Sequence, residues 1–384
     1  MTKNKMEREI AMVSDLFDIE EIKSQYNFKG EYYDFNILNN GHINNTYVLN
    51  FDYNGCEKSY VLQQINTAVF KNPDELMQNY VGVTDFVRNK VIEAGGNPLR
   101  ESIKVYYTKD GKPYYLDKAG RYWRVINYVI NTISYNFPDN TEICRKAGKT
   151  FGNFQKLLAD YPAEELCETI PNFHNTVSRY NDFIKAVEED KAGRVAEVAK
   201  EIDFVKARKK DCSVLLDLLE KGELPLRVTH NDTKLNNVLF DKKTGEGICV
   251  IDLDTVMPGL SLYDFGDSLR FAGNTADEDE KDLSKVSFNT EIYRSYTEGY
   301  LSAAGDSLAP AEIYYLPFSV KLMTLECGIR FLTDYLNGDI YFRISRPEHN
   351  LDRCRTQFRL VEEIEEKYME LMGITQLISE QLKK

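Results

Sequence analysis

One stretch of the chain concentrates side chains that could bind a metal ion and move a proton. In the run HNDTKLNN, Lys234 follows Asp232 by two residues and Asn237 follows it by five, and the apolar run CVID ends at Asp252. Carboxylate and amide oxygens are ligands that Mg²⁺ prefers, and a carboxylate can accept a proton from a hydroxyl group. The segment therefore indicates metal-assisted chemistry on a hydroxyl.

The spacing of these residues is typical of protein kinases, where an Asp, an Asn five residues later and an Asp on the following hairpin serve phosphoryl transfer. We predict that Asp232 orients the attacking hydroxyl and accepts its proton, and that Asn237 and Asp252 hold Mg²⁺ against the phosphates of ATP. Lys234 would neutralise charge on the transferring phosphoryl group. The alternative, a surface hairpin with solvated carboxylates, accounts less well for acids at the ends of apolar runs. Asp254 fits either a ligand role or a turn role.

The elements that must position this segment change in kind along the chain. Residues 1–126 predict a strand-rich N-terminal lobe with one helix, residues 127–131 a hinge, and residues 132–384 a mainly helical lobe. The fold class is therefore α+β and bilobal, like a protein kinase. Strands are expected at 31–38, 46–51, 59–65, 103–107, 113–117 and 122–130, and helices at 73–95, 141–160, 176–189, 194–221, 262–272, 290–304, 312–336 and 351–371. The tail after Thr375 is expected to fray.

Composition excludes several other classes of protein. Lys and Arg total 48 against 61 Asp and Glu, so the net charge is −13, which disfavours nucleic acid and anionic membranes as partners. No apolar run has the length of a membrane span or of a signal-peptide core. The seven cysteines form no CxxC pair, which favours reduced thiols and a cytoplasmic protein over disulfides or structural zinc. We expect a monomer.

Several motifs in chain order resemble the aminoglycoside phosphotransferase and choline kinase superfamily, and most closely its N-acetylhexosamine 1-kinases. The motifs are GHINNTY at 41–47, YVLQQIN at 60–66, YWRVINYV at 122–129, HNDTKLNNVLFD at 230–241, VIDLDTVMPGLSLYDFGDSLRF at 250–271 and GIRFLTDYLNGDIYF at 328–342. The resemblance covers most of the chain. It implies a five-stranded N-terminal lobe with a helix, a hinge and a helical C-terminal lobe.

For the nucleotide, the resemblance implies a phosphate loop and a hinge that contacts adenine. These assignments place the phosphates against Gly41, His42, Asn44, Asn45, Thr46 and Gln63, and adenine against the backbone of Asn127, Tyr128 and Val129. Relatives carry a Lys or Arg where this chain has Gln63, so another cation must compensate, and Lys71 and Arg124 are both candidates. The local sequence of the phosphate loop fits an Asn-Gly hairpin turn equally well.

For the acceptor, the resemblance implies a sugar held beside Asp232 by Thr255, Phe271, Arg330 and Tyr341. Arg330 lies within an apolar helical pattern, where an arginine is rare unless it is paired or used. A structural salt bridge is the alternative. An arginine in the pocket favours a neutral sugar over a cationic acceptor. The acids of the YDFGD motif, Asp264 and Asp267, are expected to cap or support the catalytic loop, with Arg270 as a partner.

The sequence thus predicts an ATP- and Mg²⁺-dependent kinase that phosphorylates the anomeric hydroxyl of N-acetylglucosamine or N-acetylgalactosamine, without distinguishing the two epimers. A kinase for an aminoglycoside, choline or homoserine keeps the same nucleotide site and is the first alternative. A catalytically dead kinase-like binding module is the second. Gln63 is its only support, and the retained Asp232, Asn237 and Asp252 disfavour it.

Overall fold

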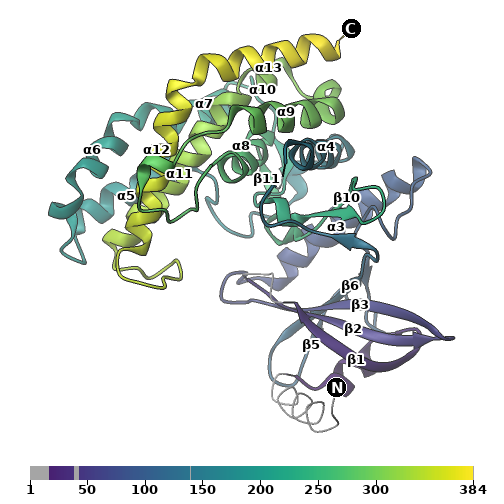
Figure 1. The fold of residues 1–384 in the computed structure, drawn as a ribbon. Coiled ribbons are helices and arrows are strands. Elements are labelled where there is room, and N and C mark those ends of the chain that lie inside the picture. The colour runs from purple at the N-terminus through teal and green to yellow at the C-terminus, as the bar shows by residue number, and fades with distance from the viewer. Residues whose placement is uncertain (1–16, 39–42, 139, 384) are drawn as a thin grey trace. The chain divides into compact units, whose positions relative to one another are not determined.

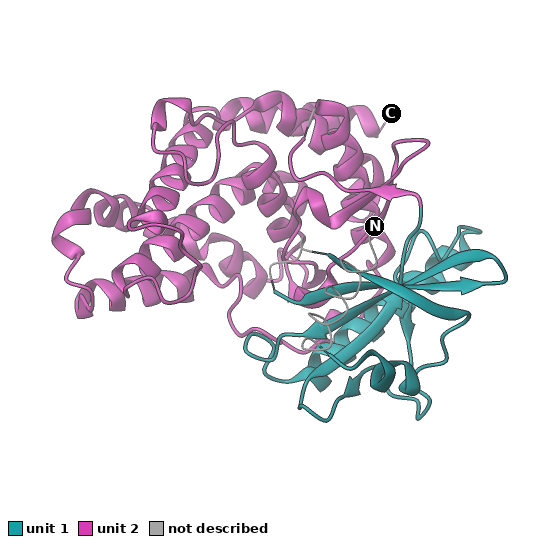
Figure 2. Ribbon diagram, turned by 60° about the horizontal axis from the view of Figure 1, so that its bottom comes forward, with its two compact units in different colours: residues 1–130 teal, residues 131–384 magenta. Residues whose placement is uncertain are grey.

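The computed structural model describes residues 17–38, 43–138 and 140–383 (Figure 1). The chain divides into two compact units, residues 1–130 and residues 131–384, which Figure 2 shows in different colours. Unit 1 is built around an antiparallel sheet and unit 2 is mainly helical, so the predicted α+β kinase-like fold is confirmed. No helix in the described ranges combines the length and the apolar character that crossing a membrane requires.

Unit 1 is a six-stranded sheet in the order β1-β2-β3-β6-β4, with β5 also paired to β6. The two-residue turn Asn54-Gly55 joins β2 to β3, and positive φ at both residues matches the right-handed twist of a tight hairpin. The strands are β1 Glu31–Leu38, β2 Asn45–Tyr53, β3 Cys56–Ile65, β4 Val105–Tyr106, β5 Tyr115–Leu116 and β6 Tyr122–Asn127. The sheet has one strand more than the five that the resemblance implied.

Two described helices belong to unit 1, where the sequence predicted one. The expected helix is α3, Pro73–Glu93, which begins after the capping side chain of Asn72. The additional one is α2, Ile19–Gln25, capped by Asp18. It is only two turns long, so its sequence carries too little periodicity to be recognised. The core of this unit surrounds Trp123, which is fully buried and donates its indole N–H to Asp117.

Unit 2 is a helical body with two small sheets, β10-β9-β7 and β11-β8. Its helices are α4 Thr141–Leu157, α5 Thr176–Glu189, α6 Ala199–Ala207, α7 Val214–Glu220, α8 Ser261–Ala272, α9 Thr290–Ala304, α10 Pro310–Tyr314, α11 Leu316–Leu336, α12 His349–Glu366 and α13 Tyr368–Leu382. Its strands are β7 Thr132–Ile133, β8 Arg227–Thr229, β9 Val238–Asp241, β10 Gly247–Val250 and β11 Met257–Gly259.

Four predictions about the helical part of unit 2 were wrong. The pattern at 351–371 predicted one helix, but α12 ends at Glu366 and α13 begins at Tyr368. The pattern at 194–221 predicted one helix, but 3-10 turns at Val195–Val198 and Lys209–Ser213 divide it. The pattern at 312–336 breaks near Tyr315, ahead of Pro317, whose ring and missing N–H oppose a continuous helix. The tail does not fray, because Ile374 and Ile378 are buried and α13 continues to Leu382.

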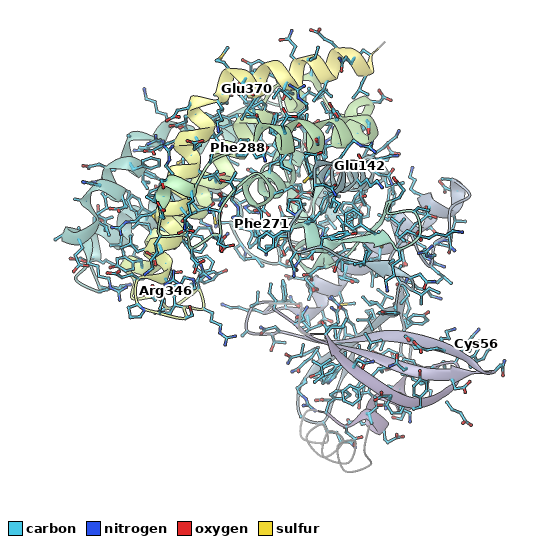
Figure 3. The ribbon with its side chains drawn as sticks, viewed as in Figure 1. Cys56, Glu142, Phe271, Phe288, Arg346 and Glu370 are labelled. Atoms are coloured by element: carbon cyan, nitrogen blue, oxygen red, sulfur yellow. The ribbon has the colours of Figure 1, made fainter. Side chains whose placement is uncertain are left out.

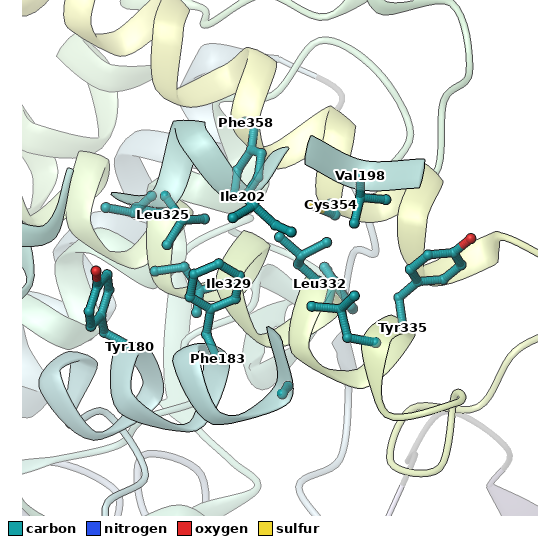
Figure 4. Close-up of a cluster of buried hydrophobic side chains, with 14 of the residues drawn as sticks. Tyr180, Phe183, Val198, Ile202, Leu325, Ile329, Leu332, Tyr335, Cys354 and Phe358 are labelled. Atoms are coloured by element: carbon teal, nitrogen blue, oxygen red, sulfur yellow. The ribbon is translucent and has the colours of Figure 1, made fainter. Parts of the chain in front are cut away.

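A buried cluster joins α5, α6, α11 and α12 in the part of unit 2 that Figure 4 shows. Phe183, Ile329 and Leu332 are fully buried there, and Phe358 of α12 covers the ring of Phe204. Val198 and Cys212 reach the same cluster from the interrupted 194–221 segment. This packing fixes α11, the helix that carries Arg330.

Candidate active site

The catalytic-loop candidate leaves β8 at Thr229 and turns sharply at Asn231, whose φ is 64°. His230 is fully buried and holds the loop from inside. Its Nδ1 accepts the backbone N–H of Asp232 at 3.2 Å, so its Nε2 carries the proton and donates to the Ile251 carbonyl at 2.9 Å. The imidazole is therefore a neutral brace between the loop and the end of β10, not a proton-transfer group.

Asp264 clamps the same loop from α8. Its two carboxylate oxygens accept the backbone N–H groups of His230 and Asn231, each at 2.8 Å, and Gln155 of α4 donates to it at 3.0 Å. Complete burial raises the pKa of Asp264, while these donors oppose the shift. The predicted loop-support role of Asp264 agrees with this geometry.

Asp232 is the partly exposed acid of the loop. Lys234 Nζ lies 2.8 Å from its Oδ1, and Asn237 Nδ2 lies 2.8 Å from its carbonyl oxygen and 3.3 Å from its Oδ2. The structure thus brings together three of the residues that the spacing selected. The carboxylate is oriented, charge-paired and reachable by a ligand, as a residue that positions a hydroxyl must be.

The arrangement of Asn237 and Asp252 fits a magnesium ion. Both bonds of Asn237 use its Nδ2, which turns its Oδ1 away from Asp232, and the Ile251 N–H donates to the Asn237 carbonyl at 2.9 Å. Asp252 follows directly in the left-handed conformation, with φ at 62°. Mg²⁺ usually takes one or two protein oxygens and completes its shell with water and phosphate. No group of three or more His, Cys, Asp or Glu side chains gathers as a metal site in the described ranges.

Thr255 is placed differently from the prediction. It is buried, its hydroxyl donates to the His230 carbonyl at 2.7 Å, and its own carbonyl accepts from Asn231 Nδ2 at 2.8 Å. Its hydroxyl proton is therefore used inside the protein, and its side chain supports the loop in this structure. Direct contact between that hydroxyl proton and a sugar would require the bond to His230 to break.

A second group of charged side chains, from α8 and the segment after it, surrounds Arg270. Arg270 pairs with Asp267 at 3.0 Å and with Glu278 at 3.2 Å, which confirms the expected partner. Burial raises the pKa of Asp267, but Arg270, His174 and Lys234 together hold it below its ordinary value. For Lys234, burial lowers the pKa, and Asp232 and Asp267 together raise it by more than burial lowers it.

Arg330 stands in an aromatic environment on α11. Its guanidinium carbon lies 5.5 Å from the ring centres of Phe173 and Phe342 and 6.0 Å from that of Tyr341. None of the ion pairs among the described residues includes Arg330, so the salt-bridge alternative is not supported. The structure therefore brings together Arg330 and Tyr341.

The loop that carries Tyr341 and Phe342 is ordered by a single carboxylate. Asp334 accepts the backbone N–H groups of Ile340, Tyr341 and Phe342 at 2.8–2.9 Å and the side chain of Asn350 at 2.8 Å. Tyr341 is nevertheless 68% exposed, so its ring is available. Asp334 was not singled out from the sequence, although a polar residue in an apolar helix run is the signal that could have found it.

A buried pair that the sequence did not reveal joins α11 to the catalytic loop. His174 Nδ1 lies 2.8 Å from Glu326 Oε1, and its Nε2 lies 3.3 Å from the Asn231 carbonyl. Both ring nitrogens face oxygen acceptors. Burial raises the pKa of Glu326, but His174, Arg330 and Thr176 together lower it by more than burial raises it. His174 and Glu326 lie 152 positions apart, so no local pattern predicts their contact.

In unit 1, the described candidate phosphate-loop residues form hydrogen bonds within the protein. Asn44 Oδ1 accepts the Asn66 N–H at 2.9 Å, Asn45 donates to Gln64 at 3.0 Å, and Gln63 donates to Thr46 at 3.2 Å. These contacts tie the start of β2 to the end of β3. Gly41 and His42 lie outside the described residues.

Of the two cations considered as substitutes for the missing strand lysine, Arg124 is the neighbour of Gln63. Its Nε and Nη2 donate to Gln63 Oε1 at 2.9 and 2.7 Å, and its guanidinium lies 4.0 Å from the ring centre of Tyr80. Arg124 is fully buried on β6, directly opposite Gln63 on β3. The cation Arg124 therefore holds the side chain of Gln63 in place and does not take the position of that residue.

The candidate hinge residues differ in burial and in whether their hydrogen-bonding groups are available to a ligand. The backbone N–H of Asn127 donates to the Lys104 carbonyl, and its side chain bonds to Lys104, Leu99 and Ser102, so its N–H groups do not serve a ligand here. Tyr128 is exposed and Val129 is buried. The predicted adenine contacts of these residues stay predictions.

Comparison with known proteins defines the class. A model of the phosphotransferase enzyme family (APH) matches residues 34–309, and the chain belongs to this family. Among solved structures, a microcompartment-associated aminopropanol kinase is 16% identical with a TM-score of 0.56, over 92% of this chain and 98% of that chain. An aminoglycoside phosphotransferase from Alicyclobacillus acidocaldarius is 12% identical with a TM-score of 0.57, over 96% of each chain. Choline kinase from Cryptosporidium parvum is 14% identical with a TM-score of 0.53, over 89% and 91%. These three solved structures are similar to this chain in fold.

Proposed function

We propose that this phosphotransferase uses ATP and Mg²⁺ to phosphorylate the anomeric hydroxyl of N-acetylglucosamine or N-acetylgalactosamine. The observation that carries the choice of acceptor is Arg330, a cation faced by three aromatic rings and by no ion-pair partner among the described residues. Arg179 lies close enough for the charge of Arg330 to lower its pKa, after the larger effect of burial. Glu326 interacts with both guanidiniums. The two donor-rich cations disfavour a cationic acceptor and suit the hydroxyl oxygens of a neutral sugar.

In the proposed reaction, Asp232 takes the proton of the anomeric hydroxyl as that oxygen forms a bond to the γ-phosphorus. The bond from the γ-phosphorus to the bridging oxygen breaks, and ADP leaves. Asn237 and Asp252 would hold Mg²⁺, which supplies charge neutralisation at the phosphates when bound. Lys234 keeps the Asp232 carboxylate oriented and places a positive charge near the transferring group. The residues around Gln63 in unit 1 are proposed to contact the nucleotide.

An amino-alcohol kinase is the second candidate, and one observation favours it. Three consecutive acids, Asp277, Glu278 and Asp279, lie beside Phe271 and could attract an ammonium group. The fold neighbours include aminopropanol and choline kinases. The acids count for less than Arg330, because Glu278 and Asp279 are already paired with arginines.

The experiment that separates the two is ADP release measured with a panel of acceptors at equal concentration. N-acetylhexosamines should support turnover, whereas choline, ethanolamine and aminopropanol should give the background rate of ATP hydrolysis. A reversed order, with an amino alcohol as the best acceptor, would replace the first proposal with the second.

A further inference from the structure

A hollow of about 220 Å³ lies in unit 2 where the end of α8 meets the following segment and α12. Phe271, labelled in Figure 3, forms part of its wall, and the hollow extends along residues 274–279 to Gln357. The full lining consists of Phe137, Arg270, Phe271, Asn274, Ala276, Asp277, Glu278, Asp279 and Gln357. None of the roles assigned above uses Gln357, Asn274 or Phe137.

Gln357 is a lining residue of this hollow and carries an unpaired acceptor. The residue is 1% exposed, and its Oε1 has no hydrogen-bond partner. Its Cβ is packed against Gly328 of α11, where even an added methyl group would approach it to 3.2 Å, so the start of the side chain is fixed. A buried amide oxygen without a donor destabilises the fold, so its persistence suggests a donor that arrives with a ligand.

The charges around the hollow are largely compensated. Glu278 pairs with Arg270, and Asp279 pairs with Arg346 at 2.7 Å and lies 3.1 Å from His349 Nε2. Asp277 is exposed at the rim. The acceptor inside the hollow is therefore a neutral amide oxygen, which suits a neutral N–H or O–H donor better than a desolvated ammonium group.

An apolar wall faces the same space. Phe137 and Phe271 stack with ring centres 5.6 Å apart and planes 19° apart, and Phe137 is 58% exposed although it is large and apolar. Exposed aromatic faces beside a hollow are typical of ligand contacts. The helix that carries Phe271 also contacts the catalytic loop, because Ser268 donates to the Thr233 carbonyl at 2.8 Å.

We propose that this hollow is the acceptor subsite for a secondary amide substituent, with Gln357 Oε1 accepting the amide N–H and the Phe137–Phe271 wall covering the acyl methyl group. The proposal rests on the proposed function and deepens it, because it names the residues that would distinguish an N-acetylated sugar from the parent sugar. An acceptor with a hydroxyl group in place of the amide substituent can still donate a hydrogen bond, but it makes no methyl contact with the aromatic wall. An acceptor with an ammonium group there also lacks the methyl contact, and it must give up its hydration.

The test compares Gln357→Met with the wild type and with Gln376→Met, a matched change at an exposed glutamine of α13. Methionine keeps the length of the side chain and removes the acceptor. We expect KM for N-acetylglucosamine to rise about 5- to 10-fold with KM for ATP unchanged, and the preference over glucose to fall by the same factor. The melting temperature should rise by about 2 °C, because an unpaired buried oxygen is lost. A purely structural glutamine would change the melting temperature and leave the ratio of KM values unchanged, which would overturn the proposal.

Phe137→Ala provides a second test that does not threaten folding, since the ring is exposed. This substitution should raise KM for N-acetylglucosamine severalfold.

If an amino alcohol is the substrate instead, the proposed function fails. An unchanged KM for that amino alcohol in both variants then overturns the proposed subsite as well. If the wild type turns over no acceptor, binding decides: N-acetylglucosamine must raise the melting temperature of the wild type and not of Gln357→Met, and no shift in the wild type contradicts the subsite.

Discussion

Lys234 Nζ lies 2.8 Å from Asp232 Oδ1, and the two side chains are about one-quarter to one-third exposed. Burial lowers the pKa of Lys234, while Asp232 and Asp267 together raise it by more, so the ammonium group stays charged at neutral pH. A carboxylate paired this way is held at one oxygen, and Asn237 contacts the other. The pair fixes the direction from which a hydroxyl can approach.

The substitution Asp232→Asn should abolish phosphoryl transfer and preserve the fold. Asparagine keeps the shape but cannot accept the hydroxyl proton, so kcat should fall by at least about 10³-fold. The melting temperature should change little, because Asp232 is partly exposed and makes no core contact. Asp306→Asn, at an exposed acid remote in sequence, serves as the control. Near-full activity of Asp232→Asn would contradict the assigned mechanism.

Replacing Arg330 with Met should weaken acceptor binding selectively. The guanidinium is expected to donate to sugar hydroxyls, so KM for the acceptor should rise about 10-fold or more while KM for ATP stays the same. Arg343→Met, at an exposed arginine on the loop after α11, is the matched control and should leave both constants unchanged. An equal loss in stability and an unchanged KM in Arg330→Met would mean that the arginine is structural.

Helices α4 and α9 cross at a distance that only glycine permits. A Cβ on Gly299 would lie 1.8 Å from the Arg145 carbonyl oxygen, so Gly299→Ala must push the helices apart and should cost about 3 kcal/mol or more. Gly373 on α13 has nothing within 4 Å of the same position, and Gly373→Ala should stabilise the protein by about 0.5–1 kcal/mol. Urea unfolding of both variants measures these effects, and equal effects would contradict the close crossing.

Glu363 gives the fold a defined acid sensitivity. Burial raises its pKa, but Lys367 at 2.8 Å, Ser287 at 2.6 Å and Arg359 lower it from 4.5 to about 2. A depressed folded-state pKa stabilises the protein above the unfolded value, and this contribution is lost as the pH falls from about 4.5 to about 2. It is on the order of 3 kcal/mol at neutral pH.

The variant Glu363→Gln should therefore lower the free energy of unfolding at pH 7 and flatten its dependence on pH below about 4.5. Glu362→Gln, at the more exposed neighbouring position, should do neither to a comparable extent. Urea unfolding between pH 3 and pH 7 measures both slopes. Parallel curves for the wild type and Glu363→Gln would show that the carboxylate is not stabilising.

The sequence predicted most of what depends on local pattern. Helix α5, Thr176–Glu189, matched its predicted bounds because an Asn cap and an apolar period mark it. Asp232, Lys234 and Asn237 came together because they share one loop, which fixes their separation. The local sequence left a cap role and a loop-support role open for Asp264, and the family resemblance implied loop support, which agrees with its bond to the His230 N–H.

The remaining features depend on contacts between distant segments. Nothing near Gln357 marks it as a pocket residue, because the hollow exists only once α12 meets the end of α8. Thr255 was assigned to the sugar, but the buried carbonyl of His230 competes for its hydroxyl. Similarly, the role of Arg124 beside Gln63 depends on the pairing of β3 with β6, which fixes their register.

The central claim is that the acceptor is the anomeric hydroxyl of an N-acetylhexosamine, and phosphorus NMR tests it most directly. The protein is incubated with ATP, Mg²⁺ and N-acetylglucosamine or N-acetylgalactosamine in separate tubes. The account predicts a new sugar 1-phosphate signal that is absent without metal and absent with Asp232→Asn. No such signal with either sugar, from protein that Mg·ATP still stabilises against heat, would contradict the assigned acceptor.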